Sequence, residues 1–431
     1  MQNYLLTQLD SGARVISEPL PSIRSAAIGL WIGTGSRDED DGHAGVTHFL
    51  EHLLFKGSRT YSAQEIAEIF DTFGGELNAA TARDYTVVYG RVLDDHVEKA
   101  LDVMTDMVFA PTLADLDSER EVVLEEIAMI EDSPQELVHD LITQAVFGNH
   151  PLGRPVLGSA DVIASVSRRS VGAYHRARYT AANVVVAAAG SIDHDRLLAL
   201  VERTEEKLRE APARKPAARA PFVAPPGPSL RFQRKDTEQY HVCLGAPGIS
   251  RSDKRRFTAS ILDGVLGGSA SSRLFQEIRE KRGLAYSVYT YSSQYADTGQ
   301  VGVYVGTREE NLRACLEILF EQIASVAAGD MSEEEVTRAK ENLKGRIMLS
   351  MELTSNRMSR LGKSLITDSE LLGLDRILAE IEAVDGDAVA KLAEVLLPAD
   401  AFSVAAIGPS RERLLESVEP VCPQLVERAA A

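Results

Sequence analysis

The chain has 431 residues, 44% of them hydrophobic, and a formal net charge of −18 at pH 7. This length predicts more than one domain, and the acidity argues against a nucleic-acid binder and favours cationic or neutral partners. No apolar run is long enough to span a bilayer, so we expect no membrane span. Three cysteines (Cys243, Cys315 and Cys422) show neither metal-ligand spacing nor an even-numbered disulfide framework.

The start of the chain has neither a basic segment nor an apolar core of the kind found in signal peptides. Together with the cysteine content, this predicts a reducing compartment. A bacterial cytoplasm is the expected location, and a mature organellar matrix protein is the alternative.

The first predicted helix carries the sequence His48-Phe49-Leu50-Glu51-His52. Histidines four residues apart share one helix face, and Glu51 falls beside them. Two imidazoles and a carboxylate that can take a proton from water are what a zinc hydrolase needs, and the pattern H-x-x-E-H is typical of inverzincins. The alternative is a core helix with two buried histidines and a chance glutamate. An apolar stripe supports the helix in either case: Val46, Phe49, Leu50, Leu53 and Leu54.

Two strands and an acidic helix are expected next. Residues 77–81 and 85–89 follow a Gly-Gly turn and are rich in strand-forming types. Residues 118–127 predict a helix that Ser118 and Glu121 cap as a capping box. On it Glu119 and Glu126 share a face, and Glu125 points about 100° away from Glu126, so only one of Glu125 and Glu126 can join the histidines. A solvated acidic face is the alternative.

Residues 41–57 resemble the active-site segment of the pitrilysin/insulinase family, in particular its mitochondrial processing peptidase-like branch with single-chain bacterial members. The resemblance implies one zinc ion per chain, bound by His48, His52 and Glu126. It implies that Glu51 is the general base and that Glu119 orients the site from outside the ligand set. Such outer carboxylates fix the ring orientation of metal-binding histidines.

Two further segments resemble substrate-binding parts of that family. Residues 77–81 resemble its edge strand, which makes Asn78, Ala79 and Ala80 candidates for pairing with a peptide backbone. Residues 279–286 resemble a segment in which an arginine and a tyrosine reach the substrate, so Arg279 and Tyr286 are candidates for catalysis and substrate binding. The alternatives are an ordinary strand, and a helix-end arginine beside a packed tyrosine.

The chain also shows an internal duplication. The pattern at 88–90, with a helix over 97–108, recurs at 303–306 with a helix over 312–323. The apolar run 184–190 recurs at 402–408. Strands and long helices without regular alternation predict an α+β fold. We expect a metal-binding half (1–210), a Pro/Ala-rich linker (211–228) and a second half (229–431) without the histidine motif. The resemblance implies that the two halves enclose a central cavity.

The predicted function is a zinc-dependent endopeptidase that hydrolyses extended peptides in a closed chamber. Its substrates would be oligopeptides or presequence-like segments, with basic peptides favoured if acidic groups line the chamber. The alternative is a non-catalytic scaffold or regulatory subunit of a processing peptidase or respiratory complex. Such relatives commonly lose one or more of the four positions matched by His48, Glu51, His52 and Glu126. The presence of Arg279 and Tyr286 on the same chain favours a self-sufficient protein, expected to be a homodimer.

Overall fold

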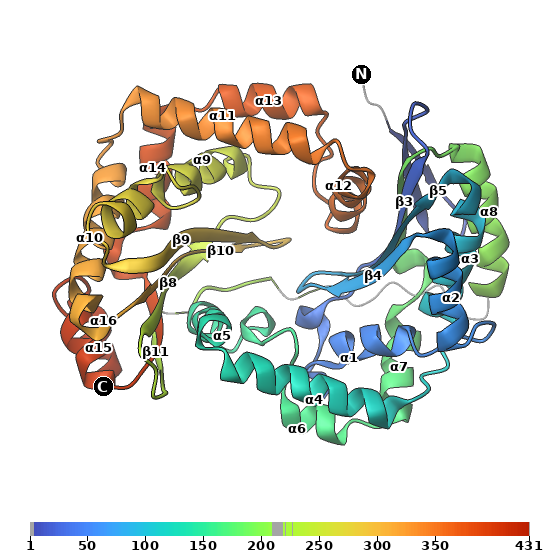
Figure 1. The fold of residues 1–431 in the computed structure, drawn as a ribbon, viewed down its shortest axis with the longest axis horizontal. Helices are drawn as coiled ribbons and strands as arrows, with labels where there is room; N and C mark the ends of the chain where they lie inside the picture. Colours follow the sequence, from blue (N-terminus) through green and yellow to red (C-terminus); the bar gives the residue numbers. More distant parts are fainter. Residues whose placement is uncertain (1–3, 209–218, 220, 226, 431) are drawn as a thin grey trace. The chain divides into compact units, whose positions relative to one another are not determined.

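The computed structural model describes residues 4–208, 219, 221–225 and 227–430, and Figure 1 shows their helices and strands. They pack as two compact units. Unit 1 contains Met1–Ala128, Pro155–Ala220 and Met348–Gly373, and unit 2 contains Met129–Arg154, Pro221–Ile347 and Leu374–Ala431. Each unit combines a sheet with helices, which confirms the α+β class.

The two units exchange segments along the chain, whereas the predicted domains follow the sequence repeat. Most of the predicted linker, 211–228, lies outside the described residues, so the boundaries at 210 and 228 stay a prediction. Within the linker, Arg219 is described. Its guanidinium donates hydrogen bonds of 2.7 and 2.6 Å to the carboxylate of Asp38 in unit 1.

Unit 1 contains a six-stranded sheet in the order β1-β2-β6-β3-β5-β4. β2 and β6 are parallel, and the other neighbours are antiparallel. β4 is therefore an edge strand, as expected from the sequence, and it pairs only with β5. The bounds are β1 Leu5–Gln8, β2 Arg14–Pro19, β3 Ser25–Ile32, β4 Glu76–Thr81, β5 Thr86–Leu93 and β6 Val184–Gly190.

Both faces of this sheet are covered. Alternate residues of a strand point to opposite faces, so Val15 and Ile28 belong to one apolar cluster while Ile16 and Ala27 belong to another. The larger cluster includes α1 (Val46–Leu54) and α3 (Val97–Phe109). The smaller cluster lies under α12 (Thr354–Ile366), a helix from the other end of the chain.

The sheet of unit 2 repeats this topology in five strands, in the order β7-β11-β8-β10-β9. β7 and β11 are parallel like β2 and β6, and β9 is the edge strand in the place of β4. The shared order confirms the predicted duplication. The bounds are β7 Leu230–Arg234, β8 Tyr240–Gly248, β9 Ala285–Gln294, β10 Gly299–Thr307 and β11 Ser403–Gly408.

Helices pack on both faces of the second sheet as well. α9, α10 and α14 contribute to its main apolar cluster, and α5 covers the opposite face. Within the described residues no helix combines the length and the apolar character needed to cross a bilayer. The remaining α-helices are α2 Ala63–Phe73, α4 Leu116–Asp132, α5 Pro134–Phe147, α6 Ala160–Ser165, α7 Arg168–Arg178, α8 His194–Leu208, α9 Arg256–Leu266, α10 Glu309–Ala327, α11 Glu333–Ser350, α13 Leu374–Glu382, α14 Gly386–Leu396, α15 Arg411–Val418 and α16 Pro423–Ala430.

Candidate metal centre

Helix α1 holds the H-x-x-E-H sequence and starts at a tightly constrained turn. Gly45 precedes it with φ of +96°, a conformation that glycine adopts without strain. The buried Glu39 carboxylate accepts hydrogen bonds from Gly45 N (2.9 Å) and Thr47 N (2.7 Å). A negative charge at a helix N-terminus is favourable because the unpaired backbone amides and the positive end of the helix dipole lie there. All five residues of the predicted apolar stripe are buried, which confirms the helix.

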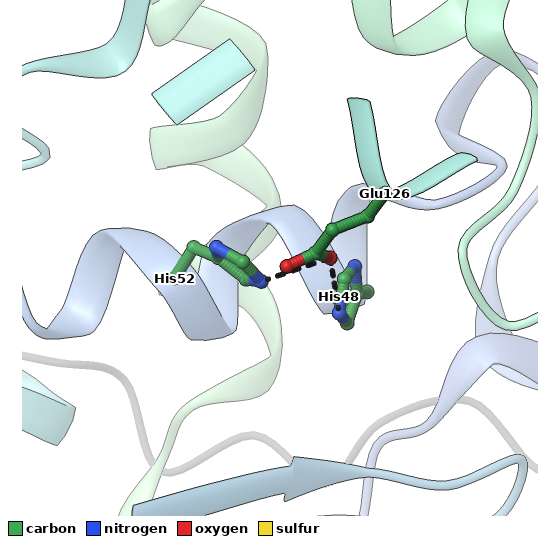
Figure 2. A group of neighbouring side chains, drawn as sticks. All are labelled: His48, His52 and Glu126. Carbon is green, nitrogen blue, oxygen red and sulfur yellow. Dashed lines mark ion pairs between the residues drawn. The ribbon is translucent and has the colours of Figure 1, made fainter. Parts of the chain in front are cut away.

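Three side chains meet on the exposed side of this helix, as Figure 2 shows. His48 Nε2 lies 3.6 Å and His52 Nε2 lies 3.5 Å from the same oxygen, Glu126 Oε2. One ligand atom from each residue lies within 4.8 Å of the others. Zinc bonds of about 2.1 Å in a tetrahedral site place ligand atoms about 3.4 Å apart. The spacing of the three residues therefore fits a zinc ion.

The protonation of His48 also suits a metal ligand. Burial, followed by the neighbouring His52, lowers the pKa of His48 to about 4. The imidazole is therefore neutral at pH 7, and a lone pair is available for coordination. Within the described residues, His48 Nδ1 is buried without a hydrogen-bond partner.

Helix α4 supplies Glu126 and also places Glu119 behind the histidines. The buried Glu119 carboxylate lies 3.4 Å from His52 Nδ1 through Oε2 and 2.6 Å from Lys56 Nζ through Oε1. Glu125 is exposed on another face of the helix. The helical period alone did not decide between Glu125 and Glu126. The structure places Glu126, and not Glu125, beside the two histidines.

The predicted start of this helix is wrong. α4 begins at Leu116, two residues before Ser118, so Ser118 lies inside the first turn and cannot form a capping box with Glu121. Its hydroxyl instead donates a hydrogen bond of 2.9 Å to the carbonyl of Asp115. Short polar side chains often bond the preceding backbone in this way.

The Glu51 carboxylate lies on the same helix and contacts the edge strand. Its Oε2 accepts a hydrogen bond from the Thr81 hydroxyl, and the Thr81 amide also donates to the carboxylate. Burial raises the pKa of Glu51, while the bonds from Thr81 and the nearby His52 oppose that rise. A carboxyl group with a raised pKa is suited to holding a proton temporarily.

The ladder between β4 and β5 determines which backbone groups of the edge strand are open. At the connecting turn, Ala82 N donates to Tyr85 O at 2.8 Å. Hydrogen bonding alternates along an antiparallel strand, so Asn78 and Ala80 pair with β5 while Leu77, Ala79 and Thr81 present their amides outward. Ala79 N is already bonded to Asn78 Oδ1 at 2.8 Å.

A groove of about 640 Å³ runs beside the start of this strand. Its walls come from the end of α1, from α2 and from β4. Phe55, Ile66, Phe70 and Leu77 provide apolar surface, and Asp71, Glu76 and Lys56 provide charge. The groove therefore combines apolar walls with groups of both signs.

Arg279 and Tyr286 belong to unit 2 and contact each other. The Arg279 guanidinium lies 4.5 Å from the Tyr286 ring centre and 4.7 Å from that of Phe275. Arg279 lies in a π-helical turn, Phe275–Glu280, and Tyr286 is 76% exposed. π-Helical turns are frequent at functional sites. The roles assigned to this pair from the sequence stay a prediction.

Sequence reasoning missed three residues that hold the site together: Glu39, Lys56 and Thr81. Lys56 follows His52 by four residues, so a longer helical pattern could have indicated its side. Thr81 shares a strand face with Ala79 and Leu77, but nothing local shows that this face meets Glu51. Glu39 acts from an irregular loop, where no periodic pattern exists.

Two family matches cover most of the chain. Residues 14–160 match the family described as "Insulinase (Peptidase family M16)", and residues 165–343 match "Peptidase M16 inactive domain". An uncharacterized zinc protease of Streptomyces coelicolor is 43% identical over 414 residues, 94% of this chain and 90% of that protein. The uncharacterized zinc protease YmxG of Bacillus subtilis is 42% identical over 406 residues, 93% of this chain and 97% of that protein. The chain belongs to peptidase family M16, the insulinase family.

Solved structures agree with this assignment at the level of the fold. A protease from Helicobacter pylori has a TM-score of 0.88 at 22% identity, covering 94% of this chain and 99% of its own. A peptidase M16 inactive domain from Pseudomonas fluorescens has a TM-score of 0.87 at 22% identity, covering 95% and 98%.

Proposed function

We propose that this protein is a zinc-dependent endopeptidase. The observation that carries the proposal is the convergence of His48, His52 and Glu126 around one point, with the Glu51 carboxylate on the same helix. The bacterial relatives are named zinc proteases, which supports a zinc-dependent peptidase activity for this chain. His48, His52 and Glu126 would hold the zinc ion, which would supply a Lewis acid to activate water and polarise a carbonyl group.

Side chains of the protein transfer the proton of the attacking water and fix the orientation of the metal ligands. Glu51 takes the proton of the attacking water and passes it to the departing amine, as general base and then general acid. Glu119 holds the His52 ring from its Nδ1 side and is itself held by Lys56. Removal of such an outer carboxylate commonly weakens metal binding because the ring loses its fixed orientation.

The proposed substrate is an extended peptide that adds to β4 as a further strand. The outward amides of Leu77 and Ala79 would provide main-chain hydrogen bonds that make little demand on sequence, with the Ala79 amide exchanging its bond to Asn78 Oδ1 for one to the peptide, whereas the outward amide of Thr81 is bonded to Glu51. Of the earlier candidates Asn78, Ala79 and Ala80, only Ala79 would then pair through its amide. The groove beside β4 would take side chains, and Asp71 on its wall favours peptides that carry a basic residue.

Two finer expectations remain part of the proposal. Arg279 and Tyr286 would contact the substrate, and two copies of the chain would form the working protein. The scaffold alternative is weakened because all four positions of the metal set are present and His48, His52 and Glu126 lie together. The cellular location stays a prediction.

Metal analysis of the purified protein, combined with cleavage of a quenched fluorogenic peptide library, tests the proposal. We expect about one zinc per chain and cleavage that a chelator abolishes and zinc restores. Glu126→Gln should lose most of its zinc, whereas Glu125→Gln, one residue away on another helix face, should keep it. Zinc without any cleavage would instead favour a chain that needs a different partner, and neither zinc nor cleavage would favour the scaffold reading.

A further inference from the structure

The Glu51 carboxylate is held by one residue of the edge strand. Thr81 donates to it from the side-chain hydroxyl and from the backbone amide. Across the described residues, these are the hydrogen bonds that the carboxylate accepts. Glu51 is half-buried, so water has restricted access to its carboxylate, and its orientation depends on Thr81.

The position of Thr81 in the ladder links this contact to peptide binding. Thr81 is the last residue of β4, and its amide points to the open side of the sheet together with those of Ala79 and Leu77. A peptide strand added to β4 would meet Ala79 and Leu77 and would find the next outward amide already bonded to Glu51. The carboxylate therefore lies at the end of the open edge, where an added strand would reach the metal residues.

We propose that Thr81 is a positioning residue for peptide hydrolysis: the strand that receives the substrate also orients the carboxylate that transfers the proton. This inference rests on the proposed function, because it needs Glu51 as the general base. A side chain that must reach a water molecule at hydrogen-bond distance loses much of its effect when it is displaced by about 1 Å.

Unit 2 contains a related contact between an edge-strand threonine and a helix carboxylate, four residues further from the hairpin turn than in unit 1. Thr290 on the edge strand β9 donates a hydrogen bond of 2.6 Å to Asp263 Oδ1, and Asp263 lies on α9 in the repeat position of α1. Burial raises the pKa of Asp263, and its bond with Thr290 opposes that rise. The two contacts lie at different register positions, and among the described residues the one in unit 1 lies beside two histidines that could hold a metal.

The test compares Thr81→Val, Thr81→Ser and the matched control Thr290→Val in zinc-loaded full-length protein. Valine keeps the branched shape and the backbone amide but removes the hydroxyl. We expect Thr81→Val to lower kcat roughly 10- to 100-fold with KM and zinc content little changed, because orientation and not binding is lost. Thr81→Ser should restore most of kcat, and Thr290→Val should leave kcat near that of the wild type.

A crystal structure of each variant provides a readout that does not depend on turnover. The Glu51 carboxylate should leave its position in Thr81→Val and keep it in Thr81→Ser and Thr290→Val. Unchanged kcat in Thr81→Val, or an unchanged Glu51 position, would overturn the inference. If Thr81→Val fails to fold, Thr81→Ala is compared with Thr81→Ser in the same way.

Glu51→Gln distinguishes failure of this inference from failure of the proposed function. If the wild type cleaves peptides, Glu51→Gln does not, and Thr81→Val remains fully active, then only the role of Thr81 is wrong. If Glu51→Gln cleaves as well as the wild type, the general base is wrong and the inference fails with it. If no variant cleaves, the position of Glu51 in Thr81→Val decides whether Thr81 orients it.

Discussion

Burial separates the roles of the charged and polar side chains around α1. His48 is kept neutral by its surroundings, with its pKa lowered to about 4, and is therefore prepared to bind a cation before the ion arrives. Glu51 is pushed toward its protonated form by burial and drawn back by Thr81 and His52. The same helix thus carries a metal ligand that burial keeps neutral, His48, and a carboxylate suited to proton transfer, Glu51.

Glu119→Gln tests the contact behind the metal ligands. The change keeps the shape of the side chain but removes the charge that lies 3.4 Å from His52 and 2.6 Å from Lys56. We expect zinc affinity to fall roughly 10- to 100-fold, with little change in the melting temperature of the metal-free protein. Competition with a zinc chelator measures this, with Glu121→Gln on the exposed face of α4 as the control. Equal affinity in both variants would contradict the role of Glu119.

Among the site residues, the sequence predicted those that lie close together along the chain. His48, Glu51 and His52 lie within one turn of helix, and the spacing of Glu119 and Glu126 places both on one face of the next predicted helix. The choice of Glu126 over Glu125 needed the family resemblance, because one helical period cannot say which face meets α1. Thr81 and Glu39 were missed because each acts through a contact between segments that no periodic pattern connects.

At the scale of elements, the start of α1 depends on a residue without a side chain. A Cβ at Gly45 would lie 2.3 Å from the carbonyl oxygen of Leu157, and its φ of +96° disfavours other residues. Gly45→Ala should therefore destabilise the protein by about 2 kcal/mol or more and reduce zinc binding. Gly74→Ala is the control: it also has positive φ (+59°), but nothing lies within 4 Å of its added Cβ, so we expect about 1 kcal/mol. Denaturant unfolding measures both, and equal losses would contradict the steric argument.

The packing of α7 against α3 carries a dependence on pH. His175 is buried and its Nε2 lies 2.8 Å from the carbonyl oxygen of Val108, and burial lowers its pKa below 6.5. The unfolded chain therefore binds a proton below pH 6.5 that the folded chain resists, so stability must fall as pH falls through that range. In His175→Gln, which can still donate to Val108, the loss of stability between pH 7 and about 5 should be smaller. Denaturant unfolding of the metal-free proteins at pH 7 and pH 5 measures this. Identical losses of stability in the wild type and in His175→Gln would show that His175 does not cause the pH dependence.

At the scale of the whole molecule, each unit is completed by a helix from the other end of the chain. α12, residues 354–366, covers one face of the first sheet, where Trp31 Nε1 lies 3.4 Å from Met358 Sδ. α5, residues 134–147, covers the corresponding face of the second sheet. α4 carries Glu126 shortly before the boundary at Ala128, so the helix that supplies the third ligand also connects the units.

A truncated chain tests this exchange. A fragment of residues 1–208 lacks α12 and would expose the apolar face formed by Ile16, Ala27, Trp31, Val185 and neighbouring residues. We expect it to bind a hydrophobic dye and to aggregate, since an exposed apolar face of this kind is unstable in water. Fusion of residues 348–373 to the fragment should cover this face and lower the dye binding, while the apolar side of α5, which packs on the second sheet, stays exposed in both fragments. A fragment 1–208 that folds as stably without residues 348–373 would contradict the account.

The sequence could indicate the duplication but not the exchange. Matching strand–helix patterns in the two halves predicted two similar sheets, and the shared strand order confirms this. Periodicity shows that α5 and α12 each have an apolar side, but it does not say which sheet receives that side. Only the packed structure shows that residues 129–154 and 348–373 belong to opposite units.

The most direct test of the central claim is the turnover of one quenched fluorogenic peptide by the wild type and by Glu51→Gln, with both proteins carrying the same amount of zinc. The account predicts that the wild type cleaves the peptide and that kcat of Glu51→Gln is at least about 100-fold lower, because a neutral amide cannot accept the proton. Equal turnover by the two zinc-loaded proteins would contradict it.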